Sequence, residues 1–172
     1  MTRFMSASTL LPFPGSSAVF SDDMIYRYSL TRAWNQTGGR CVFIGLNPST
    51  ADEIKNDNTV RLCIGFAKSW GYGALTMLNA FAFRSTYPRD LYKIDDPIGP
   101  DNDKWILDEI KNANLVVAAW GVHGKYLDRH NKLIALVPFL HCIGITKDGF
   151  PRHPLYSRKD TKPVIFNKGE KE

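Results

Sequence analysis

Polar residues follow each of four apolar runs in the sequence, and their side chains are of types that bind or activate a ligand. The four polar segments begin at Asn47, Asn79, Trp120 and Arg152. The Asn47 amide can donate and accept hydrogen bonds in a turn that Pro48 restricts, so it can orient a water molecule or a substrate edge. Alternatively, Asn47 bonds only its own backbone, as Asn does in many turns. The Asn79 amide either links two loops or binds a ligand, since an amide buried without partners costs free energy.

One histidine and one carboxylate stand out as candidate functional residues. His153 lies in a segment without an apolar period, whereas His123 and His130 lie on or near an expected helix and are interpreted as structural or solvated. Asp52 lies five residues after Asn47 and is the nearest carboxylate to the turn, so it is the candidate general base.

The residue spacing disfavours several common classes of site. The histidines are widely spaced and no carboxylate completes a ligand set with them, so no metal is expected. The chain has no G-x-G-x-x-G fingerprint, P-loop or G-x-S-x-G motif, and we expect no cofactor. Cys41, Cys63 and Cys142 lie in apolar stretches, which indicates reduced core thiols and a cytoplasmic protein. No apolar run approaches the ~20 residues of a membrane span, so no membrane contact is expected.

The positive charge is concentrated in two segments. The formal net charge is +5, which is moderate. The first segment contains Arg84 and Arg89, and the second contains Lys147, Arg152, Arg158, Lys159 and Lys162 against Asp148 and Asp160. Such segments can contact a polyanion.

The apolar runs and the segments between them predict the elements that position these residues. Runs over residues 41–44, 74–78, 115–119 and 140–145 are short and largely apolar, as in strands covered on both faces. Amphipathic helices are expected near 60–67, near 106–113 and from Val122 to about Val137, with Leu127 facing the core. Asp57, Asn58 or Thr59 is expected to cap the first helix.

This alternation predicts an α/β domain. We expect a three-layer α/β/α fold with a central, mostly parallel four-stranded sheet, and a further strand within residues 25–34 that flanks it. The carboxyl ends of parallel strands share one edge, so the four polar segments should converge there. The domain is expected over residues 24–167, after a flexible N-terminal arm over 1–23 and before a charged tail over 168–172.

Several of these segments together resemble a known family. The resemblance rests on Arg27–Trp34, Gly45–Asp52, Ala119–Gly121 and Arg152–Leu155. These stretches are similar to an uncharacterised family of bacterial and phage proteins carried as a domain of unknown function, over about residues 25–166. This resemblance implies a family without an activity.

More distantly, three landmarks resemble the uracil-DNA glycosylase superfamily. Gly45–Ser49 is similar to its first motif, of the type GINPG or GMNPG, and Asn79 resembles an Asn that ends another strand. Residues 152–157 resemble its last motif, of the HPSP type. The resemblance implies a uracil-DNA glycosylase-like fold. It also implies hydrolysis of an N-glycosidic bond to a damaged or modified base, with DNA as the partner.

The same resemblance assigns roles to individual residues. Asn47 would position the attacking water, and Asn79 would hydrogen-bond the extruded base. His153 would stabilise the negative charge that develops on the base. Contacts to the nucleic-acid backbone, or a wedge into the gap left by the base, would come from Arg84, Arg152, Leu155, Tyr156, Arg158 and Lys159.

Two departures from the glycosylase pattern predict a changed base pocket. Ser49 and Thr50 follow Pro48 where the glycosylases usually have Gly. Residues 51–65 contain no Phe, Tyr or Trp, although the aromatic residue that stacks on the base normally lies there. The pocket is expected to differ from that of the glycosylases: either it is wider and suited to a modified base, or it does not bind a base. The candidate ligand-binding residues are therefore Asn79, Pro48, Ser49, Thr50, Asp57 and Trp120.

Two other functions remain open from the sequence. The chain can be a catalytically inert module that binds nucleic acid or nucleotides on the same fold, which would account for the missing aromatic residue. It can also be an enzyme that acts on free nucleotides or nucleosides, because a net charge of +5 is small for an enzyme that acts on DNA.

Overall fold

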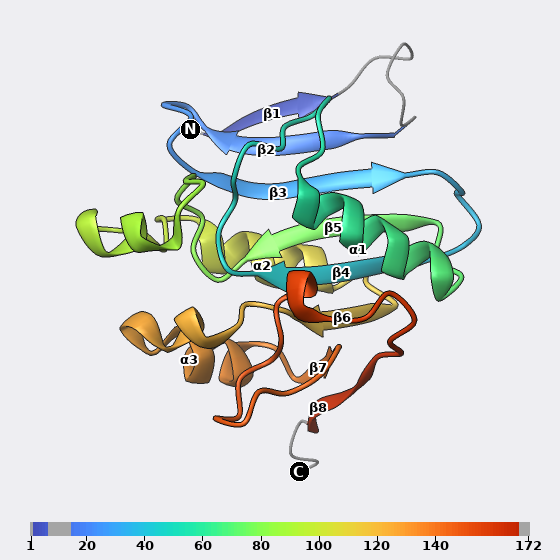
Figure 1. Ribbon diagram of the computed structural model, residues 1–172. Coiled ribbons are helices and arrows are strands. Elements are labelled where there is room, and N and C mark those ends of the chain that lie inside the picture. The colour runs from blue at the N-terminus through green and yellow to red at the C-terminus, as the bar shows by residue number, and fades with distance from the viewer. Residues whose placement is uncertain (1, 7–14, 169–172) are drawn as a thin grey trace.

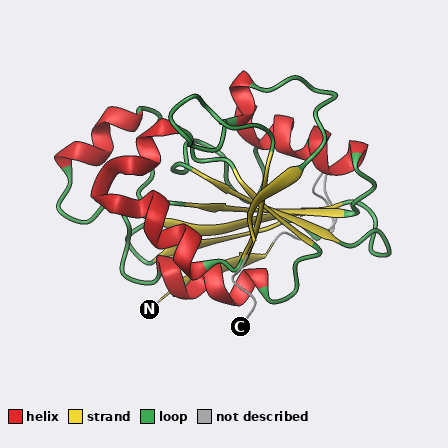
Figure 2. Ribbon diagram, turned by 90° about the horizontal axis from the view of Figure 1, so that it is seen from below, coloured by secondary structure: helices red, strands yellow, loops and turns green. Residues whose placement is uncertain are grey.

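A computed structural model describes residues 2–6 and 15–168, which form a mixed β-sheet with helices on both faces (Figures 1 and 2). Eight strands pair in the order β1-β2-β3-β5-β4-β6-β7-β8 within this part of the chain. The strands are β1 (Thr2–Ser6), β2 (Ser17–Ser21), β3 (Arg27–Ala33), β4 (Arg40–Gly45), β5 (Ala74–Asn79), β6 (Leu115–Ala118), β7 (Phe139–Cys142) and β8 (Val164–Lys168). The helices are α1 (Asn58–Ser69), α2 (Asn102–Ile110) and α3 (Arg129–Leu136), with short 3-10 helices η1 (Pro88–Lys93), η2 (Val122–Asp128) and η3 (Pro154–Tyr156).

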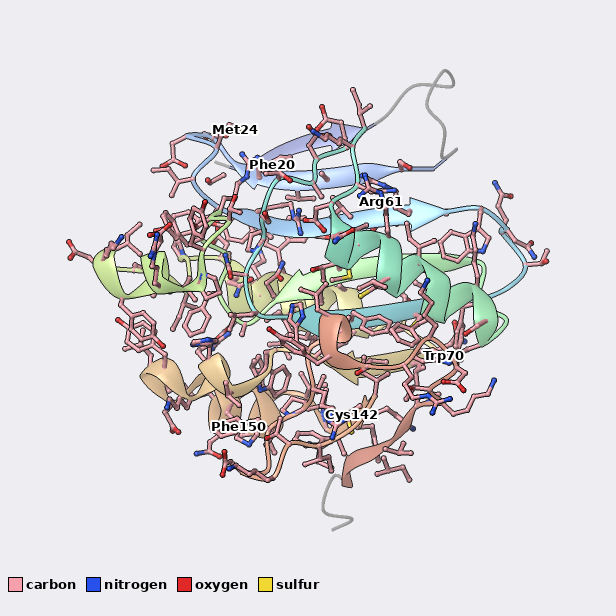
Figure 3. The ribbon with its side chains drawn as sticks, in the orientation of Figure 1. Phe20, Met24, Arg61, Trp70, Cys142 and Phe150 are labelled. Atoms are coloured by element: carbon pink, nitrogen blue, oxygen red, sulfur yellow. The ribbon has the colours of Figure 1, made fainter. Side chains whose placement is uncertain are left out.

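The central strands are buried on both faces, which explains their largely apolar sequences. In β4, Cys41 and Phe43 pack in the cluster that contains the buried side of α1, whereas Val42 and Ile44 pack in the cluster that contains α2 and α3. Figure 3 shows the side chains that fill these layers. The sheet therefore separates two apolar cores, with α1 on one side and α2 and α3 on the other.

The expected α/β class is confirmed, but the expected sheet is too narrow. The four apolar runs form β4, β5, β6 and β7, which pair in parallel in the order β5-β4-β6-β7. Beyond them, β3, β2 and β1 continue the sheet through antiparallel pairings next to β5, and β8 pairs antiparallel to β7. Antiparallel pairings thus outnumber parallel ones among the described strands, so the sheet is mixed rather than mostly parallel. The apolar runs of the outer strands, such as residues 18–20 in β2 and 164–166 in β8, are shorter than those of the inner ones.

The N-terminal segment differs from the flexible arm expected over residues 1–23. β2 lies inside this segment and pairs with β3, and β1 pairs with β2. Ala18, Val19 and Phe20 are buried, and this short run holds β2 in the sheet. Residues 7–14 of the expected arm, and 169–172 of the expected tail, lie outside the described residues.

The third expected helix is divided into two. η2 ends and α3 begins at Leu127 and Asp128, whose φ angles are +52° and +57°. Leu127, expected in the core, is 42% exposed. A Cβ on Gly124 would lie 2.2 Å from Cδ1 of Trp120, so the chain at η2 is packed tightly against that ring. The apolar period of the sequence does not reveal this local contact.

Candidate functional site

A cavity of about 690 Å³ lies at the carboxyl edge of the parallel strands. Segments after β4, β5, β6 and β7 all contribute to its wall, as the topology predicts. The main polar contributions are Asn47, Ser49 and Asp57 after β4, Ser85 and Thr86 after β5, Trp120 and His123 after β6, and Thr146, Arg152 and His153 after β7. Pockets of roughly 300–1,000 Å³ are typical of small-molecule sites.

Asn47 uses one half of its amide for structure and leaves the other half to face the cavity. Its Nδ2 donates to the carbonyl oxygens of Ser85 at 2.8 Å and Pro48 at 3.2 Å. These two acceptors fix the orientation of the amide, because only the NH2 group can donate to them. Oδ1 has no hydrogen-bond partner among the described residues, and Asn47 lies in the cavity wall. The side chain therefore supports the turn and also presents an acceptor to a ligand or water.

Two buried arginines of β3 hold the loop that carries Asn47 and Asp57. Nη1 of Arg27 donates to the carbonyl of Ala51 at 2.8 Å, and burial lowers the pKa of Arg27 to about 10. Nε of Arg32 donates to Oδ1 of Asn56 at 2.8 Å. Nη2 of Arg32 donates to the carbonyls of Asp52 and Lys55. The antiparallel flank of the sheet thus determines the shape of the loop after β4.

His153 is held as a neutral donor. Its Nδ1 accepts a hydrogen bond of 3.3 Å from the backbone N–H of Leu155, at the start of η3. Burial lowers the pKa of His153 below its ordinary value, and the charge of Asp57 offsets part of that shift. The ring is therefore neutral at pH 7, and since Nδ1 accepts, Nε2 carries the hydrogen. A neutral imidazole N–H suits a ligand oxygen that becomes negative during a reaction.

The two candidate carboxylates have different positions. Asp57 caps α1, as expected, because its Oδ1 accepts from the N–H of Val60 at 2.9 Å, and it also lies in the cavity wall. Asp52 is not in that wall. Its Oδ1 accepts from the backbone N–H groups of Ile54 and Lys55 at 2.9 and 2.7 Å, which closes a local turn. Asp57 is therefore the acidic residue that a ligand in the cavity would meet.

Asn79 lies behind the cavity rather than in its wall. Its side chain is 3% exposed, and its Nδ2 has no hydrogen-bond partner among the described residues. A Cβ on the neighbouring Gly45 would lie 3.0 Å from Oδ1 of Asn79, so Gly45 leaves the space that this amide fills. The structure thus brings Asn47 and His153 to one cavity and leaves Asn79 beneath it.

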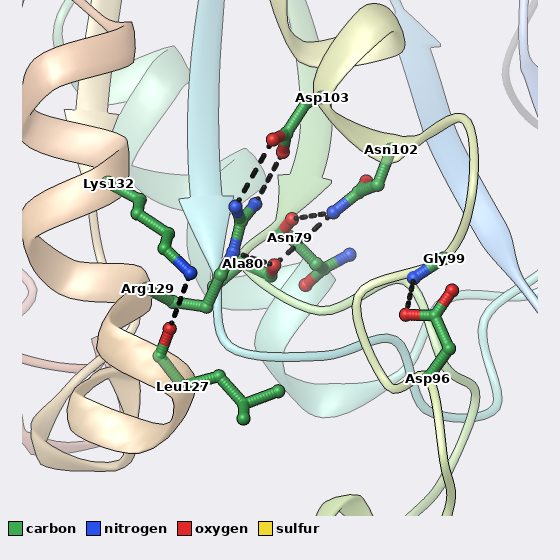
Figure 4. A network of polar contacts seen from close by, with 9 residues as sticks. All are labelled: Asn79, Ala80, Asp96, Gly99, Asn102, Asp103, Leu127, Arg129 and Lys132. Atoms are coloured by element: carbon green, nitrogen blue, oxygen red, sulfur yellow. Dashed lines mark hydrogen bonds and ion pairs between the residues drawn. The ribbon is translucent and has the colours of Figure 1, made fainter.

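A polar network fixes the chain just after β5 (Figure 4). Nδ2 of Asn102 donates to the carbonyls of Asn79 and Ala80 at 3.0 and 3.3 Å. Nε of Arg129 donates to the carbonyl of Ala80 at 2.8 Å, and its Nη2 pairs with Asp103 at 2.7 Å. Asn102 and Arg129 are buried, so α2 and α3 position the strand end from the far face of the sheet.

Trp120 forms a fixed part of the cavity wall. Its indole N–H donates to Nδ1 of His130 at 3.2 Å, and the side chain is buried. Burial lowers the pKa of His130, while Asp128 raises it, so the ring remains an acceptor at neutral pH. Gly124 packs against the indole, as described above. Trp120 therefore supplies an immobile apolar surface to the cavity.

A comparison with protein families identifies the chain. The model described as "Protein of unknown function (DUF1643)" matches residues 27–155, which include β3, the turn after β4 and His153. The chain belongs to the DUF1643 family. The family carries no stated activity, and no curated protein matches the chain.

One solved structure is distantly similar to this DUF1643 protein. It is the crystal structure of a "Putative hydrolase from Agrobacterium vitis S4", with 14% sequence identity. The match covers 98% of this chain and 69% of the other, with a TM-score of 0.28. A likeness this weak supports no argument about fold or chemistry.

The remaining predicted site residues of the DUF1643 protein are divided between the cavity and its surroundings. Four of them line the cavity: Ser49, Arg152, Leu155 and Tyr156. Thr50 and Arg84 line a neighbouring hollow, and Lys159 lines another. Pro48 is buried in the turn, where its carbonyl accepts from Asn47 and from the N–H of Ser85. Arg158 pairs with Asp160 at 2.9 Å, which neutralises part of its charge.

Several wall residues were missed by the sequence reasoning. They are Asn58, Thr59, Ser85, Thr86, His123 and Thr146. His123 is exposed in the wall, and the hydroxyl of Tyr92 lies 3.4 Å from its Nδ1. Each missed residue lies on a segment that follows a predicted strand, so the rule that identified Asn47 could have found them. His123 lies in η2, in agreement with the expectation of a position on or near a helix, but its ring is in the cavity wall, whereas the sequence analysis interprets it as structural or solvated.

Within residues 2–6 and 15–168, no three His, Cys, Asp or Glu side chains form a group that could hold a metal ion. No helix in these ranges is both long and apolar enough to cross a membrane. The three cysteines are free and buried, as expected from their apolar neighbours.

Proposed function

We propose that the protein hydrolyses the N-glycosidic bond of a damaged or modified base in DNA. The observation that carries this proposal is the pairing of two groups in one cavity. Asn47 presents an amide oxygen that no described residue contacts by a hydrogen bond, and His153 presents a neutral N–H. One group accepts from a water molecule, and the other donates to the leaving base. Together they fit the two ends of a glycosidic displacement.

In this mechanism Asn47 and Asp57 act on the water. Oδ1 of Asn47 accepts a hydrogen bond from the water and directs its oxygen at the anomeric carbon of the sugar. The new C–O bond forms as the C–N bond breaks, and the electron pair of that bond leaves with the base. Oδ2 of Asp57 takes the water proton, since Oδ1 caps α1. The negative Asp57 also favours the positive charge that develops on the sugar.

His153 acts on the leaving base. Nε2–H donates to a carbonyl oxygen of the base, where negative charge increases as the bond breaks. The donor is fixed beforehand by the backbone bond to Nδ1, so little reorganisation is needed during the reaction. Removal of one such donor costs about 10²–10³ in rate. The base leaves as an anion and takes a proton from solvent.

The first experiment uses oligonucleotides that contain uracil, hypoxanthine, hydroxymethylated bases or glycosylated bases. Release of the base leaves a site that breaks in hot alkali, and gel electrophoresis detects the break. We expect cleavage of at least one substrate, with losses of about a hundredfold or more for Asn47→Ala and His153→Ala. Asn131→Ala on the surface of α3 is the matched control and should retain full activity.

The outcomes separate the three functions considered from the sequence. Inertness across the panel, with free nucleosides also untouched, would contradict the proposal. Selective binding of a modified oligonucleotide without base release, unchanged in Asn47→Ala, would indicate a binding module instead. Release of the base from nucleosides but from no oligonucleotide would assign the chemistry to free substrates.

A further inference from the structure

Two smaller hollows adjoin the cavity and extend it in two directions. One, of about 490 Å³, lies between the turn after β4 and the chain after β5, and shares Ser49, Ser85 and Thr86 with the cavity. The other, of about 360 Å³, follows α1 and shares Asn58 with the cavity. We call these three adjoining spaces the groove. A ligand that filled the cavity could therefore continue past it on both sides.

Each extension of the groove contains cationic side chains without a carboxylate partner among the described residues. Arg61 of α1, labelled in Figure 3, and Lys159 line the α1 extension, and both are exposed. Neither forms an ion pair with a described residue. In the other extension, Nη1 of Arg84 donates to the carbonyl of Met24, and its guanidinium lies 4.7 Å from the centre of the Phe20 ring.

The position of the charges fits a polymer better than an isolated nucleotide. The cavity wall itself contains one arginine or lysine among the described residues, Arg152, whereas the extensions add charge on either side. From Asn58 to Phe66 the α1 extension covers roughly 12 Å at 1.5 Å per helical residue. A stretch of that length can lie beside more than one phosphate of a strand. Phosphates on both sides of a base in the cavity would thus meet cations.

We infer that the groove holds a single strand of DNA, with Arg61 and Lys159 contacting phosphates on one side of the cavity and Arg84 on the other. This inference rests on the proposed function for the kind of polymer. The cations of the groove are few compared with the roughly six to ten phosphate contacts of a typical duplex-binding protein. A base also reaches the cavity at lowest cost when it is not paired. Tyr156, 79% exposed in the cavity wall, offers a ring on which a neighbouring base can stack.

The test uses a fluorescent single strand of about twelve thymidines and its duplex with the complementary adenosine strand, in a titration monitored by anisotropy. The strand carries no modified base, so the result does not depend on base release. The variant Arg61→Gln/Lys159→Gln removes both charges of the α1 extension. The matched control, Lys104→Gln/Lys132→Gln, removes two exposed charges from α2 and α3 on the opposite face of the sheet.

We expect the wild type to bind the single strand more tightly than the duplex. In Arg61→Gln/Lys159→Gln the affinity should fall at least tenfold at low salt. The slope of log K against log salt should become about 1.4 less steep, at about 0.7 per phosphate contact. The control should match the wild type. An unchanged slope in Arg61→Gln/Lys159→Gln, or tighter binding of the duplex, would overturn the inference.

The failure of this inference and that of the proposed function are distinguishable. Strand binding with the expected salt slope, but no base release from any substrate, leaves the groove assignment intact and removes the glycosidic chemistry. Release of bases from nucleosides, with no binding of the thymidine strand, retains the chemistry and removes the strand from the groove.

Discussion

Replacement of Asn47 by Asp separates the structural half of the amide from the half that faces the cavity. The wild-type NH2 group donates to the carbonyls of Ser85 and Pro48. The carboxylate of Asn47→Asp would lack both donors but keep an acceptor oxygen where Oδ1 lies. Each hydrogen bond contributes about 0.5–1.5 kcal/mol, so the variant should lose about 2 kcal/mol at pH 8. For a chain of this length, that loss lowers the melting temperature by roughly 4–8 °C.

The pH dependence of the same variant gives a second readout. The new carboxyl group would face two carbonyl oxygens, which raises its folded pKa above the unfolded value near 3.9. The folded variant then binds more protons than the unfolded chain as the pH falls, so its deficit relative to wild type should shrink between pH 8 and pH 5. Urea unfolding at both pH values measures this. A variant as stable as wild type at pH 8 would refute the structural role of the amide.

The activity of the variant tests the other half of the amide. Under the proposed mechanism the acceptor oxygen directs the water, and Asn47→Asp keeps an acceptor while Asn47→Ala does not. Asn47→Asp should therefore be at least tenfold more active than Asn47→Ala, although both lose the bonds that hold the turn. Equal activity of the two variants would mean that Asn47 acts only through the turn.

Three further perturbations follow from contacts already described. Gly124→Ala places a Cβ 2.2 Å from Trp120, and calorimetry should show a loss of about 1–3 kcal/mol. Arg27→Met leaves the carbonyl of Ala51 without its donor, which should cost about 1–3 kcal/mol in urea unfolding; a smaller loss would show that Arg27 does not hold the loop. The lowered pKa of His153 means that the unfolded chain takes up its proton first as the pH falls below about 6.5, so stability decreases there, and His153→Gln should weaken that decrease. Under the proposed mechanism, the rate of base release should stay constant from pH 8 to about 6.5. It should fall at lower pH because protonation of Nδ1 removes the acceptor of the Leu155 N–H bond that fixes the ring.

The inner strands and the first helix cap could be predicted because their signals are local. The run 41–44 is buried on both faces, and burial of this kind requires an apolar residue at every position. The Asp57 cap needs only the residues next to it. In each case the sequence near the feature contains the whole physical cause.

The features that were not predicted depend on contacts between distant segments. The path of the chain at Asp52, whose carboxylate lies outside the cavity wall, is held by a hydrogen bond from Arg32 of β3 to its carbonyl. Asn79 was expected to face a ligand, but strand alternation directs its side chain over Gly45. The periodicity of a single segment does not encode contacts with other segments. The rule that ligands bind at the carboxyl ends of parallel strands therefore located the site but did not predict the orientation of each residue in it.

The arginines of β3 make the shape of the loop after β4 depend on the pairing of the antiparallel strands. The loop after β4 is attached to the parallel strands at its ends, but its interior is held by Arg27 and Arg32 from the antiparallel flank. A chain that has paired only its parallel strands would therefore have Asn47 at the right strand end, but residues 51–56, which lead to Asp57, would lack the contacts that hold them. A fragment that begins after Arg32 would lack this support, and transfer of the turn to another sheet would require transfer of β3 as well. The working unit of this protein is thus larger than the residues that line its cavity.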